Sequence, residues 1–327
     1  MNKIKLTFIN VGYGEAILIE CPDDTREGGI VTALIDGGSA EQEEYADRSS
    51  GRITVSEYLA SRKIRKIDYI ISTHIHEDHL CGMAEAVREV EPGELWQAIP
   101  EDIFREFSPL NVNEAETASQ NKCMHAVNDY ISLCEMMKNK GKEIKTLHSG
   151  DVISLCDDIK IKVLAPGAKE LSELVLMMRG LYEKVEREEF LRRLSVLDAK
   201  MNNYSLVLNL DCRGTRILLP GDTNRIGYGG INNEDLRADI FKIGHHGQAD
   251  SIDENILKRV DPSVCVCCAS SDRRYNSAHP DVINMIGEYG AETYFSDCPG
   301  LPGTEIPAHR ALVFTIGKNG IENIVYE

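Results

Sequence analysis

Runs of apolar residues alternate with helix-spaced stretches along the whole chain. Short apolar runs that stop at glycine, proline or aspartate predict strands, because buried strands end where the chain must turn. The expected strands are residues 4–10, 15–21, 31–35, 67–72, 145–147, 152–155, 159–164, 205–210, 215–219, 311–316 and 321–326. Apolar positions at helical spacing predict helices at residues 55–63, 82–90, 113–140, 170–199 and 280–289. Strands that alternate with helices indicate an α/β protein.

A run of histidines and carboxylates follows the apolar segment 67–72. The run is His74-Ile75-His76-Glu77-Asp78-His79. In an extended segment His74 and His76 point to the same side, because they are two residues apart. Asp78 and His79 are adjacent and need a turn before both can face one site. Imidazole and carboxylate groups suit zinc, iron and manganese, so the run predicts ligands for two neighbouring metal ions.

Three other strand-like runs also end in a polar residue. Asp36 follows the strand at 31–35, Asp222 follows the strand at 215–219, and a run near residue 241 ends in His245 and His246. Each run delivers its polar residue at the carboxyl end. We therefore expect one site that is assembled from strand ends and held by a rigid scaffold.

These motifs resemble those of the metallo-β-lactamase superfamily, whose hallmark is H-x-H-x-D-H. Three further stretches are similar to the soluble hydrolase domain of the ComEC DNA-uptake protein and its stand-alone relatives. They are Val11-Gly12-Tyr13-Gly14-Glu15-Ala16, Asn203-Tyr204-Ser205-Leu206-Val207-Leu208 before Gly221-Asp222, and Gly244-His245-His246-Gly247 with the later His279-Pro280. The resemblance implies a four-layer αββα sandwich. It also implies a single domain over residues 1–327, with helical insertions at about 113–141 and 168–200.

The resemblance implies a set of metal ligands. They are His74, His76, Asp78, His79, Asp222 and one of His245 and His246. The two histidines of His74-Ile75-His76 would bind the first ion, Asp78 and His79 the second, and Asp222 would bridge both. The residues leave open which of His245 and His246 completes the second site. Asp36 is expected to accept a hydrogen bond from a ligating histidine. The implied cofactors are two divalent ions, with zinc as the first choice and manganese as the second.

One position departs from the superfamily pattern. Most members carry a further histidine one hairpin upstream of the bridging aspartate, whereas residues 202–205 here read Asn-Asn-Tyr-Ser. His148 lies too far upstream to replace it, and His125 is expected to be structural. The first metal site is therefore expected to be weaker, with Asn203 or Ser205 in its outer shell.

The reaction implied by the resemblance is two-metal hydrolysis of an ester-type bond. Phosphodiesters suit it best, because paired cations stabilise the negative charge that builds on the oxygens. Asp78, Asp222 and His279 are the expected catalytic residues. His279 and Lys242 are candidates for phosphate contact or proton donation, although Lys242 is expected to face a helix or solvent. The expected site mouth also includes Tyr13 and Glu15.

The charge of the chain limits the substrate. The sequence has 36 basic and 53 acidic residues, which gives a formal net charge of −17. That charge repels phosphate backbones at long range and weighs against a non-specific nucleic-acid binder. Arg225, Arg273 and Arg274 could form a modest phosphate-binding rim. We therefore expect short phosphodiesters to be preferred over long duplex DNA.

The ends and the cysteines of the chain bear on its compartment. The first residues lead directly into a strand, and no apolar run approaches 18 residues, so neither a secretory signal nor a membrane helix is expected. We expect a cytoplasmic protein whose ten cysteines are reduced. Cys265, Cys267 and Cys268 are expected to lie in a buried strand rather than to bind metal.

Three functions compete at this stage. The leading hypothesis is a metal-dependent phosphodiesterase or nuclease. The same fold also supports hydrolysis of carboxylic esters, lactones or thioesters. A third hypothesis is a partner-dependent effector module that uses the helical insertion as a docking surface for another protein. The sequence leaves the substrate, the metal and the oligomeric state open.

Overall fold

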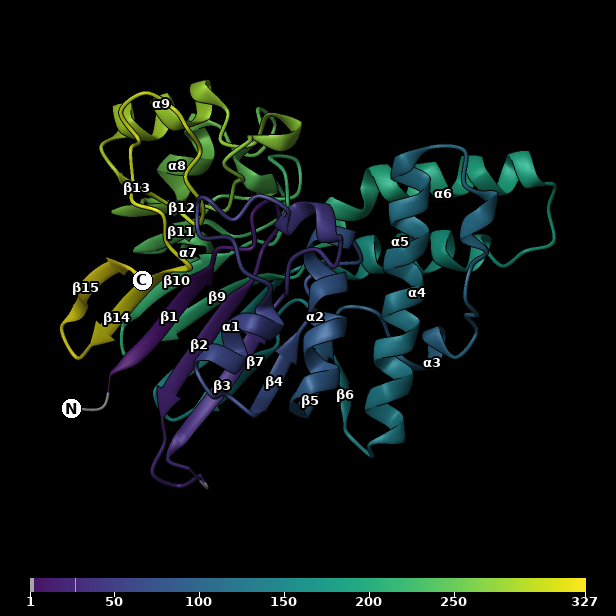
Figure 1. Cartoon of the computed structure of the whole chain (residues 1–327), viewed down its shortest axis with the longest axis horizontal. Helices are drawn as coiled ribbons and strands as arrows, with labels where there is room; N and C mark the ends of the chain where they lie inside the picture. The colour runs from purple at the N-terminus through teal and green to yellow at the C-terminus, as the bar shows by residue number, and fades with distance from the viewer. Residues whose placement is uncertain (1–2, 27) are drawn as a thin grey trace.

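The computed structural model describes residues 3–26 and 28–327, and two mixed sheets lie at its centre (Figure 1). The 8-stranded sheet has the order β15 (Gly320–Tyr326), β14 (Ala311–Gly317), β1 (Ile4–Ile9), β2 (Ile17–Pro22), β3 (Ile30–Ile35), β4 (Lys66–Ile71), β5 (Glu91–Gln97) and β6 (Ile144–Thr146). The 7-stranded sheet has the order β13 (Glu292–Phe295), β12 (Val264–Cys267), β11 (Ile240–Lys242), β10 (Thr215–Leu219), β9 (Val207–Cys212), β8 (Ile159–Ala165) and β7 (Val152–Cys156).

Each sheet has an antiparallel part and a parallel part. Strands β3, β4, β5 and β6 pair in parallel, and so do β10, β11, β12 and β13. Parallel neighbours need crossover connections, and their carboxyl ends lie at the same edge of the sheet. The loops that follow β3, β4, β10 and β11 carry the polar residues predicted from the sequence.

Helices cover the outer faces of the two sheets. They are α1 (Val55–Ser61), α2 (Glu77–Glu89), α3 (Glu101–Phe104), α4 (Ala118–Asn139), α5 (Ala168–Gly180), α6 (Arg187–Met201), α7 (Asn233–Leu236), α8 (Glu254–Val260) and α9 (Pro280–Tyr289). Short 3-10 turns are η1 (Gln42–Tyr45), η2 (Val112–Glu114), η3 (Asn202–Tyr204), η4 (His245–Gly247) and η5 (Arg274–Asn276). In Figure 1, α1 and α2 lie over β3–β5, whereas α8 and α9 lie beside β11–β13.

Three buried clusters separate the four layers. The middle cluster joins the two sheets and includes Leu6, Phe8 and Ile217. Their neighbours along the strands face outward, so Ile9 packs with the helices of the first sheet and Leu218 with those of the second. This alternation follows from the period of two in a strand. The predicted αββα sandwich is confirmed.

The helical insertions form one group at the side of the sheets. Helices α4, α5 and α6 lie together at the right of Figure 1. Helix α4 packs against α2 and α6, and α6 packs against α5. The expected helix at 170–199 is in fact two helices, because residues 181–186 interrupt it with a turn. Strand β5 was not predicted, because its Glu-Pro-Gly-Glu start hides the apolar pattern.

The helix expected at 82–90 begins five residues earlier, at Glu77. Asp78 and His79 therefore lie in its first turn, which supplies the turn that the sequence required. Within the described part of the chain, no helix is long and apolar enough to span a membrane. The ten cysteines form no disulfide among the described residues, and Cys265 and Cys267 lie in the buried strand β12, as predicted, whereas Cys268 is buried just after it.

A close approach between α2 and the loop after β3 generates a prediction. A Cβ atom at Gly82 would overlap the backbone oxygen of Gly37 and would lie 2.9 Å from that of Gly38. We expect Gly82→Ala to destabilise the protein by about 1–3 kcal/mol, although alanine normally favours a helix, because the loop must move away. Urea unfolding measures the change in free energy.

Gly287 provides the matched control for this substitution. It lies in α9, is exposed, and leaves open space around the position that an alanine Cβ would occupy, with no atom within 4 Å. We expect Gly287→Ala to stabilise the protein by up to about 1 kcal/mol. Equal effects of the two substitutions would show that the contact between α2 and the loop after β3 carries no constraint.

Candidate metal centre

The site is built from loops at the carboxyl ends of β3, β4, β10 and β11. The loop after β4 carries His74 and His76 and continues into α2 with Asp78 and His79. The loops after β3, β10 and β11 carry the remaining predicted residues, which are Asp36, Asp222, His245 and His246. Because both sheets turn the same ends of these strands toward one edge, residues from four separated segments meet there.

Four of these side chains form a buried cluster. The ligand atoms of Asp78, His79, Asp222 and His246 all lie within 4.8 Å of one another. His246 Nε2 is 2.9 Å from Asp222 Oδ2 and 3.1 Å from Asp78 Oδ2. His79 Nε2 is 3.3 Å from Asp222 Oδ1 and 3.3 Å from His246 Nε2. Two imidazole and two carboxylate groups in a largely buried pocket match the donor set of a divalent transition metal.

His74 and His76 form the neighbouring part of the site. His74 Nε2 lies 3.2 Å from His76 Nδ1, so both nitrogens face the same small space. The His74 ring also packs against His79, with 4.3 Å between ring centroids. The atoms of Asp36, His74 and His79 make a second group within 4.8 Å of one another. The structure therefore brings His74 and His76 beside the four-residue cluster.

Asp36 links its own loop, which follows β3, to the loop that follows β4. Its carboxylate accepts hydrogen bonds from His79 Nδ1 at 2.7 Å and from the backbone and hydroxyl of Thr73 at 2.9 and 2.5 Å. The residue adopts a left-handed conformation with φ of 54°, a strained geometry for a residue with a side chain. This is the arrangement expected of an acceptor that fixes the orientation of a ligating histidine.

The structure distinguishes His245 from His246. His246 is fully buried and directs Nε2 into the cluster, while its Nδ1 lies 2.8 Å from the backbone oxygen of Cys268. His245 turns away and lies 2.8 Å from Asp250. Both residues have a positive φ, at 46° and 51°, so a strained turn separates their directions. The sequence could not decide between them, because the direction depends on that turn.

The charges of the cluster stabilise one another. Burial alone lowers the pKa of His246, but Asp222 and Asp78 outweigh it and raise this pKa to about 9. Burial raises the pKa of Asp222, yet the positive charges of His246 and His79 hold it well below its usual range. Positive charge beside Asp222 thus keeps its carboxylate ionised in this buried pocket. A bound divalent cation would supply such a positive charge.

Lys242 corrects one expectation from the sequence. It was expected to face a helix or solvent, or to contact phosphate, but its side chain is fully buried. The ammonium group forms an ion pair with Glu15, donates a hydrogen bond to the backbone oxygen of Gly221 at 2.8 Å, and lies 3.4 Å from Asp222 Oδ1. Glu15 is also fully buried and does not lie at the site mouth. The ion pair of Lys242 and Glu15 therefore holds the loop that carries Asp222 through contacts with Gly221 and Asp222.

Ser205 and Asn203 occupy different places. Ser205 is buried, and its hydroxyl accepts a hydrogen bond from the backbone nitrogen of Asp222 at 3.2 Å. Asn203 instead lines a separate cavity of about 340 Å³ with Tyr204 and Ile226. The structure thus brings Ser205 to the site as a support for the Asp222 loop, and it does not bring Asn203 there.

His279 lies outside the cavity that the metal cluster opens into. It caps the start of α9, where its Nδ1 accepts a hydrogen bond from the backbone nitrogen of Asp281 at 3.3 Å. Its own backbone nitrogen donates to Gly247 at 2.8 Å, next to His246. This placement gives no support to the expected catalytic role of its side chain. The residue anchors the loop that carries His246 instead.

A cavity of about 300 Å³ opens above the cluster. Its lining includes the expected residues His76, Asp78, Asp222, His245 and Tyr13. Arg274, which was expected in the phosphate-binding rim, also lines the cavity. The sequence assigned no role to the other lining residues, which come from the loops after β3, β11 and β12, the start of α2, helices α4 and α6, and η3: Ser39, Glu44, Glu77, Ser119, Lys122, Cys123, Asp198, Asn202, Gln248 and Tyr275. No motif marks Ser119 or Asp198, because only the packing of α4 and α6 brings them here.

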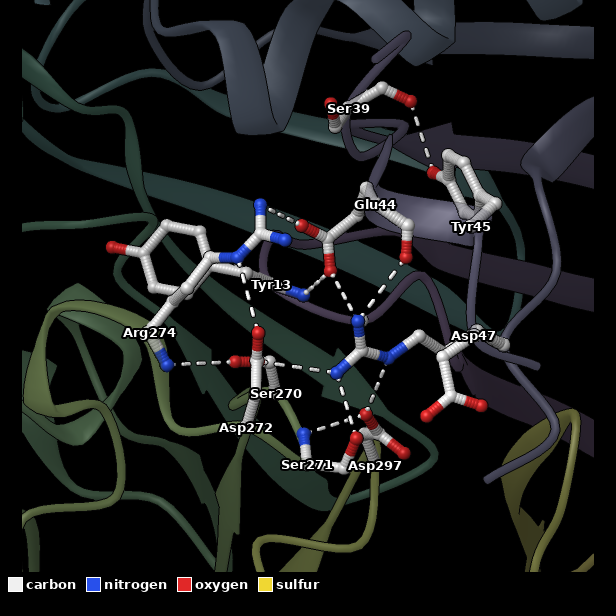
Figure 2. Close-up of polar contacts among 12 residues, drawn as sticks. Tyr13, Ser39, Glu44, Tyr45, Asp47, Ser270, Ser271, Asp272, Arg274 and Asp297 are labelled. Carbon is white, nitrogen blue, oxygen red and sulfur yellow. Dashed lines mark hydrogen bonds and ion pairs between the residues drawn. The ribbon is translucent and has the colours of Figure 1, made fainter. Parts of the chain in front are cut away.

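A buried network of charges fixes the rim of this cavity (Figure 2). Glu44 accepts hydrogen bonds from the backbone of Tyr13 at 2.8 Å and from Arg52 at 2.9 Å, and it pairs with Arg274 at 2.6 Å. Arg52 also reaches Asp297 at 3.0 Å. The Tyr13 ring then packs on His246, with 4.5 Å between centroids. This network connects the rim to the metal cluster.

The expected phosphate-binding rim is only partly assembled. Arg274 lines the cavity, but its charge is already paired with Glu44 and Asp272. Arg273 donates a hydrogen bond to the backbone oxygen of Ser277. Neither Arg273 nor Arg225 is among the residues that line this cavity. Lys122 supplies a second cation to the lining, from helix α4.

Comparison with known proteins identifies similar sequences. The family model of the metallo-β-lactamase superfamily matches residues 10–109, which include Asp36 and the run from His74 to His79. ComE operon protein 3 of Bacillus subtilis (strain 168) is 23% identical over 305 residues, which are 90% of this chain. The chain spans 32% of the length of that relative.

Solved structures with distant similarity include two enzymes. The diiron β-hydroxylase CmlA from Streptomyces venezuelae is 12% identical, with a TM-score of 0.46, and the match covers 97% of this chain and 54% of that one. The short form of human tRNase Z is 12% identical, with a TM-score of 0.37, and the match covers 80% of this chain and 91% of that one.

The sequence matches agree with what the structure shows independently. The four-layer arrangement of sheets and helices is that of the matched superfamily, and the H-x-H-x-D-H run lies at the end of β4. The chain thus matches the metallo-β-lactamase superfamily model over residues 10–109, has that superfamily's layered fold, and resembles ComE operon protein 3 over most of its own length.

Proposed function

We propose that this protein is a two-metal phosphodiesterase that acts on short substrates. The observation that carries the proposal is the pair of adjacent donor groups at the base of one cavity. His74 and His76 form the first group. The second group consists of four residues: Asp78, His79, Asp222 and His246. The close nitrogen–nitrogen distances of 3.2 and 3.3 Å fit positions that share a cation.

The residues fit divalent metals in the proposed roles. His74 and His76 would hold the first ion, and Asp78, His79 and His246 the second, while Asp222 offers one oxygen toward His79 and the other toward His246. Two divalent ions supply Lewis acidity and lower the pKa of a coordinated water. Zinc is the first choice and manganese the second, since the donors are imidazole and carboxylate.

The residues of the chain hold this centre and shape its access. Asp36 and the backbone oxygen of Cys268 orient His79 and His246. Lys242 and Ser205 fix the loop of Asp222. The packed ring of Tyr13 covers one side of the cluster and leaves the cavity as the way in. The substrate would enter this cavity with its scissile group toward the cluster.

Charge in the cavity favours a short phosphodiester. The lining holds five carboxylates and two cations, Lys122 and Arg274. Two divalent ions together with these two cations would outweigh the carboxylates locally and attract a phosphate group. Beyond the cavity the net charge of −17 repels a long polyanion. A phosphodiester centre also gains most from paired cations, because negative charge builds on its oxygens.

Removal of the Asp222 carboxylate tests the metal assignment. We expect Asp222→Ala to lose at least one metal ion per chain and to lower turnover by about 100-fold or more. Loss of an outer-shell partner alone can lower the activity of a metal site by up to about 100-fold, and Asp222 is proposed as a direct ligand. Elemental analysis and turnover of the purified protein measure both effects. His125→Ala, an exposed position in α4, is the control and should change neither. Full metal content with normal turnover in Asp222→Ala would refute the assignment.

Model substrates separate the reaction classes. We expect metal-loaded protein to hydrolyse bis-p-nitrophenyl phosphate faster than p-nitrophenyl acetate, and to lose this activity with a chelator and regain it with Zn²⁺ or Mn²⁺. The reason is the demand of a phosphodiester for paired cations. A clear preference for the carboxylic ester would instead favour the alternative hydrolase class. Activity that appears only with a copurified protein would favour a partner-dependent module.

Substrate length tests the role of charge. We expect a dinucleotide to be hydrolysed faster than a short single strand, and the single strand faster than a plasmid, at matched phosphate concentration. Duplex binding should weaken steeply as salt rises. The assay is release of product at two salt concentrations. Efficient plasmid degradation at physiological salt would contradict the preference and favour a nuclease.

A further inference from the structure

Each histidine of the metal centre has one ring nitrogen bound to an oxygen outside the centre. His79 Nδ1 contacts Asp36 at 2.7 Å, and His246 Nδ1 contacts the oxygen of Cys268 at 2.8 Å. His74 Nδ1 lies 3.0 Å from the hydroxyl of Thr73. A neutral imidazole has one N–H, so a nitrogen that donates outward leaves the other with its lone pair toward the centre.

His76 follows the same rule with its nitrogens exchanged. Its Nδ1 faces His74 Nε2 at 3.2 Å, inside the centre. Its Nε2 faces Asp198, whose backbone oxygen lies at 3.2 Å and whose carboxylate oxygen lies at 3.4 Å. Both acceptors for His76 therefore come from a residue of α6, in the helical insertion. The other three acceptors come from loops of the two sheets.

Helix α4 holds Asp198 in this position. The hydroxyl of Ser119 donates a short hydrogen bond to Asp198 Oδ2. One turn away, Gln120 of α4 donates to Ser195 of α6 at 3.1 Å. The two helices also pack against each other. The carboxylate of Asp198 thus has a fixed direction, set by both insertions together.

We propose that Asp198 is a positioning residue that keeps His76 in the tautomer with hydrogen on Nε2. Nδ1 then presents its lone pair to the first metal ion. The inference rests on the proposed function for the identity of that ion. Asp198 acts through His76, because it lies on the Nε2 side of the ring and is absent from both groups of converging ligand atoms.

The inference gives the insertion a role inside the site. The first metal lacks the upstream histidine of the superfamily pattern, so His76 carries a larger share of its binding. An imidazole that rotates or changes tautomer would cost this ion one of its protein ligands. The α4–α6 pair prevents both, by holding the far nitrogen of the ring. A docking role for the insertion is not needed to explain this contact.

The test compares Asp198→Ala, Asp198→Asn and Glu188→Gln in the full chain. Glu188 is an exposed residue of α6 and serves as the control. The first measurement is the ¹⁵N imidazole spectrum of metal-free protein, at a pH where the rings are neutral. We expect the Nε2–H form of His76 in the parent protein and in Glu188→Gln. Asp198→Ala loses the carboxylate but keeps the backbone oxygen at 3.2 Å, so it should show a larger share of the Nδ1–H form than the parent protein. Asp198→Asn, which keeps a side-chain acceptor oxygen, should restore the parent ratio of tautomers.

The second measurement is titration with Zn²⁺ or Mn²⁺. We expect Asp198→Ala to bind the weaker of two ions about 10–100-fold less tightly, as for other outer-shell partners, with the tighter ion unchanged. Asp198→Asn should recover most of the loss. Parent-like tautomer and affinity in Asp198→Ala would overturn the inference. Failure of the parent protein to bind any divalent ion would refute the proposed function, while the tautomer in metal-free protein would still decide the role of Asp198.

Discussion

The site depends on holding imidazole and carboxylate groups close together in a largely buried space. The ligand atoms of Asp78, His79, Asp222 and His246 lie within 4.8 Å of one another, and all but Asp78 are fully or almost fully buried. Buried polar groups are costly unless they have partners. Each loop therefore needs its own hydrogen bonds, and much of the surrounding structure supplies them.

Buried ion pairs act as supports for these loops. Lys242 and Glu15 lie beneath Asp222, and Arg52 with Glu44 lies behind Tyr13. A buried pair of this kind adds little net stability, because desolvation offsets the attraction. Loss of one partner is expensive, however, since the other charge is left unpaired. These pairs therefore specify the positions of the loops more than they stabilise the fold.

The helical insertions are part of the same construction. Helix α4 contributes Ser119, Lys122 and Cys123 to the cavity, and α6 contributes Asp198. Helix α4 also buries apolar side chains against α2, which carries Asp78 and His79, and α6 packs on α4. Packing in the outer layer and geometry at the metal centre are therefore connected through α2. A substitution in the interface between α4 and α2 would therefore change both the packing of the outer layer and the geometry of the metal centre.

Along the sequence, the alternation of strands and helices predicted an α/β protein, and the resemblance of its motifs to a known superfamily implied the αββα layers and the convergence of His74, Asp78, His79 and Asp222. Strand period, helix period and the H-x-H-x-D-H run are local patterns, and local patterns can be read along the chain. The resemblance also implied that Asp36 accepts a hydrogen bond from a histidine of the site, and in the structure its carboxylate lies 2.7 Å from His79 Nδ1. Strand β5 and the start of α2 were missed or displaced where charged or turn-forming residues mask the period.

Only the tertiary structure decided the rest. The choice of His246 over His245 depends on two residues with positive φ, and no apolar pattern encodes that turn. Lys242 looked exposed because lysine usually is, but Glu15, 227 residues earlier, gives it a buried partner. Asp198 meets His76 across 122 residues. Contacts between distant segments form only when the layers pack, so a reading of neighbouring residues cannot contain them.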